Sequence, residues 1–192
     1  MEALLVSTGV VALAEIGDKT QLLAFVLAAR FKKPLPIILG ILVATLANHG
    51  LAGALGVWIT SLVSQEALRW VLGISFIAMA AWMLVPDKIE EDGDELGRGR
   101  GVFTATLVAF FLAEMGDKTQ IATVAMAARF TDAIWVVVGT TLGMMLANVP
   151  AVLLGDKLAG RIPMKLVHGI AAAIFALLGL ATLLGAGQAW GF

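Results

Sequence analysis

Apolar residues are concentrated in six long stretches, and short polar segments separate them. The stretches lie near residues 3–29, 34–60, 66–85, 102–128, 133–155 and 164–187. A helix needs about 20 predominantly apolar residues to cross the hydrocarbon core of a bilayer. The pattern therefore predicts an all-α polytopic membrane protein with six transmembrane helices.

The first and fourth stretches are longer than a bilayer requires. Each has about 27 residues, which is roughly 40 Å of continuous helix at about 1.5 Å per residue. The hydrocarbon core is only about 30 Å thick, so we expect these two segments to tilt, bend or break. Gly17 and Gly116 lie near their centres and are the expected break points.

A hydrophilic linker from Pro86 to Gly101 divides the chain into halves of three spans each. It is the longest polar segment of the chain, and it contains six acidic residues: Asp87, Glu90, Glu91, Asp92, Asp94 and Glu95. We therefore predict a first three-helix repeat over 1–85, an acidic linker over 86–101 and a second three-helix repeat over 102–192.

The two halves also share sequence. Ala14–Gln21 reads AEIGDKTQ and Ala113–Gln120 reads AEMGDKTQ, so seven of eight positions are identical at a spacing of 99 residues. Further matches pair Ala28–Phe31 with Ala127–Phe130, Gly40 with Gly139 and, after a one-residue slip, Leu46–Asn48 with Leu146–Asn148. Because each half has an odd number of spans, the copies must have opposite orientations. Inverted repeats of this kind are typical of secondary transporters.

The basic residues of the loops lie mostly on one side of the predicted membrane. Nine follow spans one, three and five: Arg30, Lys32, Lys33, Lys88, Arg98, Arg100, Lys157, Arg161 and Lys165. The opposite side has only Arg69 and Arg129. Since Lys and Arg are enriched in cytoplasmic loops, we expect a cytoplasmic linker and both termini outside.

Composition supports a membrane protein and excludes several other classes. Hydrophobic residues make up 60% of the chain, charged residues 14%, and mean hydropathy is +0.95. A net charge of −1 gives no basic surface for nucleic acid, and the absence of Cys excludes disulfides and thiolate metal sites. Nothing indicates an enzyme or a prosthetic group, and we expect the first apolar segment to be retained because no basic residue precedes it.

The duplicated motif places acidic residues near the bilayer midplane. Glu15 and Asp18, like Glu114 and Asp117, are three residues apart and would share one helix face. Each charge there costs about 2.5–3.5 kcal/mol, so the six charges of both motifs would cost roughly 15–20 kcal/mol if unpaired. Glutamate–lysine pairs at i, i+4 offset part of this cost, but four acids and two lysines leave two negative charges. A bound divalent cation would cancel them.

The candidate ligands are all hard oxygen donors. They are Glu15, Asp18, Glu114 and Asp117, with Thr20, Gln21, Thr119, Gln120, Asn48 and Asn148. Such donors suit calcium, manganese or magnesium better than zinc or copper. Methionines near the second motif offer sulfur as well, but we interpret them as packing residues. His49 could relay protons, although a structural histidine is the more ordinary interpretation.

The duplicated Glu-φ-Gly-Asp-Lys-Thr motif, in two three-helix halves around an acidic linker, resembles the GDT family of manganese and calcium transporters. The resemblance covers essentially the whole chain. It implies a transporter that moves a divalent cation in exchange for protons, and bacterial members look like manganese exporters. It also implies that the four motif acids coordinate the ion, that the Thr and Gln residues support them, and that the protein lies in a bacterial inner membrane.

Physical reasoning favours the same cycle, in which clustered carboxylates hold protons until an arriving cation displaces them. One alternative is an exporter of organic cations or amino acids, which would favour an aromatic cage. Another is an intramembrane aspartyl protease, which fits poorly because Glu15 replaces the Gly of the Gly-x-Gly-Asp pattern and the chain has no Tyr. The residues are compatible with manganese, calcium or magnesium, with either direction of transport, and with a monomer or a homo-oligomer.

Overall fold

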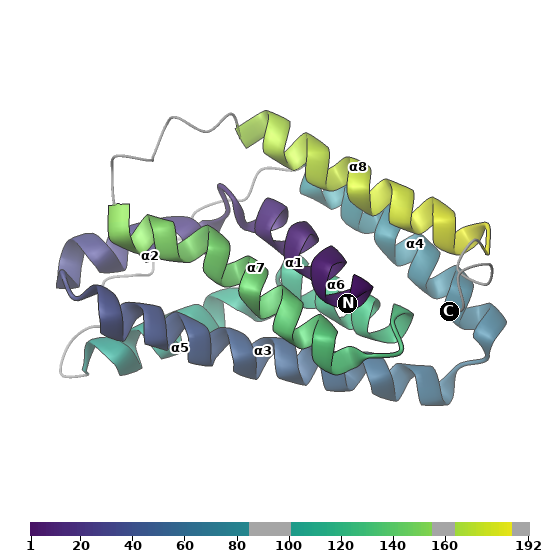
Figure 1. The fold of residues 1–192 in the computed structure, drawn as a ribbon, viewed down its shortest axis with the longest axis horizontal. Coiled ribbons are helices and arrows are strands. Elements are labelled where there is room, and N and C mark those ends of the chain that lie inside the picture. Colours follow the sequence, from purple (N-terminus) through teal and green to yellow (C-terminus); the bar gives the residue numbers. More distant parts are fainter. Residues whose placement is uncertain (85–100, 155–163, 186–192) are drawn as a thin grey trace.

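The computed structural model describes residues 1–84, 101–154 and 164–185, and this part of the chain folds into eight α-helices without strands (Figure 1). The helices are α1 (Glu2–Glu15), α2 (Lys19–Phe31), α3 (Pro34–Leu62), α4 (Gln65–Met83), α5 (Val102–Glu114), α6 (Lys118–Arg129), α7 (Ala133–Leu154) and α8 (Met164–Leu183). The predicted all-α class is confirmed. The predicted linker falls almost wholly on residues 85–100, outside the described part, and the division into 1–85, 86–101 and 102–192 stays a prediction.

The two overlong stretches are each broken into two helices. Gly17, between α1 and α2, has φ of 87°, and Gly116, between α5 and α6, has φ of 75°. Residues with a side chain rarely adopt this left-handed conformation, whereas glycine adopts it without steric cost. The predicted breaks are confirmed, and the motif of each repeat therefore lies across a helix break instead of along one helix face.

Three helices are individually long and apolar enough to cross a bilayer, within the residues described. They are α3, α7 and the Glu66–Met83 portion of α4. The outer surface carries many exposed large apolar side chains, such as Leu5, Val26 and Trp58, while eighteen polar or charged residues of the described ranges are buried. This distribution is the reverse of a soluble protein and matches a protein whose outer surface contacts lipid.

The two repeats pack together around an approximate two-fold relation. In Figure 1, α1 lies against α7 and α3 lies near α5, while α4 pairs with α8. The equivalent helices α3 and α7 run in opposite directions, as inverted repeats require. Each repeat therefore completes its core with helices of the other.

Two glycine contacts show the two-fold relation at atomic detail. A Cβ atom on Gly40 would lie 2.9 Å from the Phe103 carbonyl oxygen, and one on Gly139 would lie 2.6 Å from the Leu4 carbonyl oxygen. Both members of the first pair are 99 residues from those of the second. Glycine allows the backbones of α3 and α5, and of α7 and α1, to approach closely, as small residues do at helix contacts in lipid.

Candidate cation site between the two repeats

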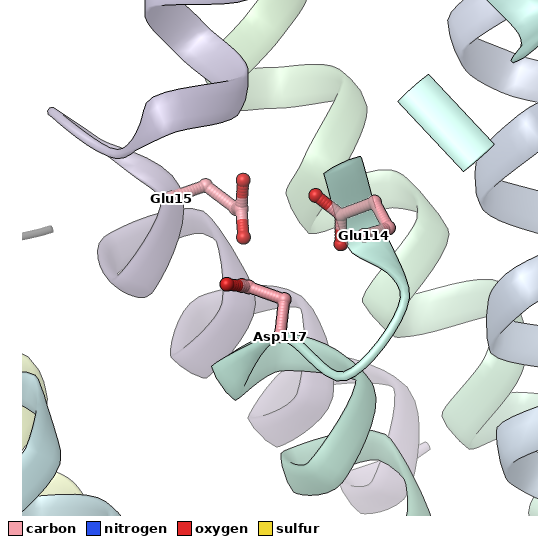
Figure 2. Close-up of side chains that lie close together, drawn as sticks. All are labelled: Glu15, Glu114 and Asp117. Atoms are coloured by element: carbon pink, nitrogen blue, oxygen red, sulfur yellow. The ribbon is translucent and has the colours of Figure 1, made fainter. Parts of the chain in front are cut away.

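The helix breaks of the two repeats meet in the protein interior and bring three carboxylates together. Glu15 is the last residue of α1, Glu114 is the last residue of α5, and Asp117 is the N-cap of α6. One oxygen atom from each lies within 4.8 Å of the other two, and the side chains point toward one another (Figure 2). Relative exposures are 0%, 0% and 4%, so protein surrounds the cluster.

The helix termini favour negative charge at this place. Asp18 and Asp117 are the N-caps of α2 and α6, and the Thr119 amide donates a long 3.5 Å hydrogen bond to Asp117 Oδ2. Helix N-termini carry unpaired amides and partial positive charge, which stabilise carboxylates and anions nearby. The breaks therefore both orient the acids and supply part of their electrostatic compensation.

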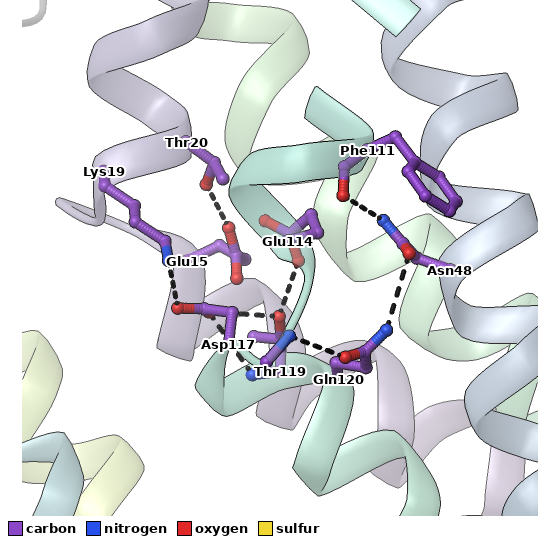
Figure 3. A network of polar contacts seen from close by, with 10 residues as sticks. Glu15, Lys19, Thr20, Asn48, Phe111, Glu114, Asp117, Thr119 and Gln120 are labelled. Atoms are coloured by element: carbon purple, nitrogen blue, oxygen red, sulfur yellow. Dashed lines mark hydrogen bonds and ion pairs between the residues drawn. The ribbon is translucent and has the colours of Figure 1, made fainter. Parts of the chain in front are cut away.

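A threonine orients each glutamate by the same contact in both repeats. The Thr20 hydroxyl donates to Glu15 Oε2 at 2.5 Å, and the Thr119 hydroxyl donates to Glu114 Oε2 at 2.9 Å (Figure 3). The other oxygens, Glu15 Oε1 and Glu114 Oε1, are buried and have no hydrogen-bond partner among the described residues. Since a buried carboxylate oxygen without a partner is costly, these two atoms are well suited to bind a cation.

The motif glutamines support the helix breaks. Gln21 accepts from the Gly17 amide at 3.0 Å, and Gln120 accepts from the Gly116 amide at 2.8 Å. Each also reaches the opposite repeat: Gln21 Nε2 donates to the Ala147 carbonyl at 3.0 Å, and Gln120 Nε2 donates to Asn48 Oδ1 at 3.4 Å. The glutamines therefore stabilise the helix breaks beside the acids and connect each break to the opposite repeat.

The glutamine contacts also show which residue of the second repeat is equivalent to Asn48. Gln21 and Gln120 are 99 residues apart, and so are their partners Asn48 and Ala147. Asn48 is therefore equivalent in space to Ala147, and Asn148 to His49. These contacts therefore follow the spacing of 99 residues, whereas the sequence match of Asn48 with Asn148 follows a spacing of 100.

As a result, the two asparagines have different surroundings. Asn48 Nδ2 donates to the Phe111 carbonyl at 3.0 Å, which joins α3 to α5 (Figure 3). Asn148 Nδ2 donates to the Met144 carbonyl at 3.1 Å and to its sulfur at 2.9 Å, both on the same helix. Among the described residues no hydrogen bond joins Asn148 to the acids, and its buried Oδ1 has no partner.

The motif lysine of the first repeat pairs with the opposite repeat. Lys19 Nζ lies 2.8 Å from Asp117 Oδ1. The expected i, i+4 pair with Glu15 is absent from the described contacts, because the helix breaks between the two residues and the helical spacing is lost. Asp18 and Lys118 are buried, with relative exposures of 3% each, and Asp18 lies outside the group of three carboxylates.

Comparisons with known proteins agree with this architecture. The family model "Divalent cation/proton antiporter GDT1" matches residues 3–91 and again residues 102–190, once for each repeat. A protein of Vibrio cholerae serotype O1 named "Putative manganese exporter" is 54% identical over 183 residues, which are 95% of this chain and 90% of that protein.

More distant relatives come from plants and cyanobacteria. GDT1-like protein 3 of Oryza sativa is 30% identical over 91% of this chain and 71% of its own length. GDT1-like protein sll0615 of Synechocystis is 30% identical over 86% of this chain and 88% of its own. No solved structure gives a significant match. The chain belongs to the GDT1 family of divalent cation/proton antiporters, and it is an integral membrane cation transporter and not an enzyme.

Proposed function

We propose that the chain exports manganese in exchange for protons through the site formed by Glu15, Glu114 and Asp117, with calcium as a second substrate. The observation that carries the proposal is the group of three buried carboxylates within 4.8 Å, contributed by both repeats. The name of the Vibrio cholerae relative favours manganese as the ion. The family description favours a divalent cation as the substrate over an organic cation or an amino acid.

The geometry and charge of the site support a single divalent ion. Oxygen ligands lie about 2.0–2.6 Å from magnesium or calcium, so ligands on opposite sides of one ion are roughly 4–5 Å apart. The spacing within 4.8 Å agrees with this range. The three carboxylates carry a charge of −3 when all are ionised, and one divalent cation offsets two of these charges.

Asp18 belongs to the proposed ligand set through the approximate two-fold relation. It is the equivalent of Asp117 and, like it, caps a broken helix at the site. When the repeats exchange conformations during alternating access, Asp18 takes the position that Asp117 has here. Thr20 and Thr119 orient the glutamates by hydrogen bonds. Gln21, Gln120 and Asn48 stabilise the helix breaks by hydrogen bonds. Asn148 remains a candidate oxygen donor from α7, since its buried Oδ1 has no partner among the described residues.

Proton exchange follows from the same cluster. Like charges at this distance, away from water, strongly disfavour full ionisation of all three acids. When the cation leaves, protons replace it, and one site exposed alternately to each side then exchanges cations for protons. We propose a bacterial inner membrane, with both termini outside and the linker in the cytoplasm.

Uptake into proteoliposomes with an imposed pH gradient tests the proposal. We expect manganese to enter against the direction of proton flow, calcium to enter more slowly, and collapse of the gradient by an ionophore to remove the accumulation. A manganese flux that is insensitive to the gradient would exclude proton exchange. The absence of flux for both ions would exclude the proposed substrates.

The threonine contacts lead to a prediction about ion affinity. Thr119→Val removes the hydroxyl that orients Glu114, and a lost supporting contact of this kind typically costs about 10–100-fold in metal affinity. We expect the apparent KM for manganese to rise about tenfold, with a similar rise for Thr20→Val. Thr60→Val is the control, since the exposed Thr60 hydroxyl donates to the Val57 carbonyl of its own helix, away from the acids. An unchanged KM in Thr119→Val would contradict this role.

A further inference from the structure

The Lys19–Asp117 ion pair lies at one corner of the carboxylate cluster and joins the two repeats. Asp117 therefore serves two partners, because the carboxylate that Lys19 contacts is also one of the three proposed ligands. The Lys19 ammonium therefore neutralises part of the negative charge that would attract an arriving cation (Figure 3).

Two cations on one carboxylate repel each other strongly in a buried site. A divalent ion bound by Asp117 and the Lys19 ammonium at 2.8 Å from Oδ1 would lie only a few ångströms apart, with little water to screen them. Simultaneous occupation is therefore unfavourable, and the two cations compete for Asp117.

Lys19 has more room to move than the acids have. Its side chain is 32% exposed, while Asp117 is 4% exposed and the two glutamates are fully buried. A long, flexible lysine stem lets the charged end move toward a polar surface while the stem stays against apolar neighbours. Lys118, at the same position of the second repeat, is 3% exposed and lacks this freedom.

From these observations we propose that Lys19 is a resident cation of the transport site. It neutralises Asp117 when no substrate is bound, leaves when the divalent cation arrives, and returns to assist release. This inference rests on the proposed function. It makes Lys19 a positioning residue that sets affinity: the apparent affinity for the ion is the intrinsic affinity multiplied by the fraction of time that Asp117 is free of the lysine.

The test compares manganese binding and transport in Lys19→Met, Lys19→Arg and the control Lys33→Met, whose lysine is exposed at the N-cap of α3. We expect Lys19→Met to bind manganese about tenfold more tightly by calorimetry and to turn over more slowly at saturating manganese. Lys19→Arg should stay closer to the parent chain, and Lys33→Met should match it. Weaker or unchanged binding in Lys19→Met would overturn the inference, since a purely structural ion pair predicts that result.

A second measurement uses the parent chain and does not depend on a variant that folds. Lysine acylation followed by peptide mass spectrometry should show Lys19 reacting several-fold faster in saturating manganese, with Lys33 unchanged. A rate unaffected by manganese would overturn the displacement of Lys19. If the parent chain neither binds nor transports manganese, the proposed function fails together with this inference. If it does both and Lys19 shows neither effect, only the role of Lys19 fails.

Discussion

Replacing Glu114 by glutamine is expected to reduce manganese transport by about 100-fold or more. Loss of a supporting contact alone costs about 10–100-fold in metal affinity, and this change removes a ligand that belongs to the buried group of three carboxylates. Glutamine keeps the size of the side chain, so packing around the end of α5 is preserved. Initial rates of manganese uptake into proteoliposomes measure the effect.

The same variant separates loss of function from loss of folding. Glu114 Oε1 has no partner in the described part of the structure, so the substitution replaces an uncompensated buried charge by a neutral amide of the same size. We therefore expect the melting temperature in detergent to be equal or higher. Glu66→Gln, at an exposed position of α4, is the matched control and should transport normally. Near-normal transport by Glu114→Gln would contradict the site.

The second large effect is expected at the contact between α1 and α7. A Cβ atom on Gly143 would lie 2.7 Å from the Thr8 carbonyl oxygen and 2.8 Å from the Ala12 amide nitrogen. These are backbone atoms, so relief requires α1 to move away, and overpacking typically costs about 1–3 kcal/mol. We expect Gly143→Ala to lower the free energy of unfolding by about 1–3 kcal/mol and to lower transport, because α1 ends at Glu15.

Gly50→Ala is the matched control for this prediction. Gly50 is also within a long helix, but a Cβ atom there would meet no atom within 4 Å. Alanine is favoured over glycine in helix interiors by about 1 kcal/mol, so Gly50→Ala should raise stability while Gly143→Ala lowers it. Denaturant titration of the detergent-solubilised proteins measures both. Equal effects at the two positions would show that close packing of α1 on α7 does not limit stability.

The helical segments could be predicted because they depend on local chemistry. Among the residues described, each apolar stretch of the required length coincides closely with one helix, or with two helices where the stretch is broken. The unusual length of two stretches predicted the breaks at Gly17 and Gly116. The duplicated motif identified the acids for a similar reason: charges are costly in a bilayer, so a repeated set of them indicates a site.

Contacts between the repeats were not predictable in the same way. Helical spacing paired Lys19 with Glu15, whereas the structure pairs it with Asp117, since the helix ends between Glu15 and Lys19. Aligning identical residues of the two repeats places Asn48 opposite Asn148. The hydrogen bonds of the glutamines instead place Asn48 in the position equivalent to Ala147.

For this protein, the sequence by itself determined the helical membrane architecture, the inverted repeat and the identity of the acidic residues. Only the tertiary structure decided that Glu15, Glu114 and Asp117 form one group, that Asp18 lies outside it, and that Lys19 contacts Asp117. The physical reason is that hydrophobicity and helix geometry act along the chain over a few residues. The site, in contrast, is formed where two broken helices, about 100 residues apart in sequence, pack against each other.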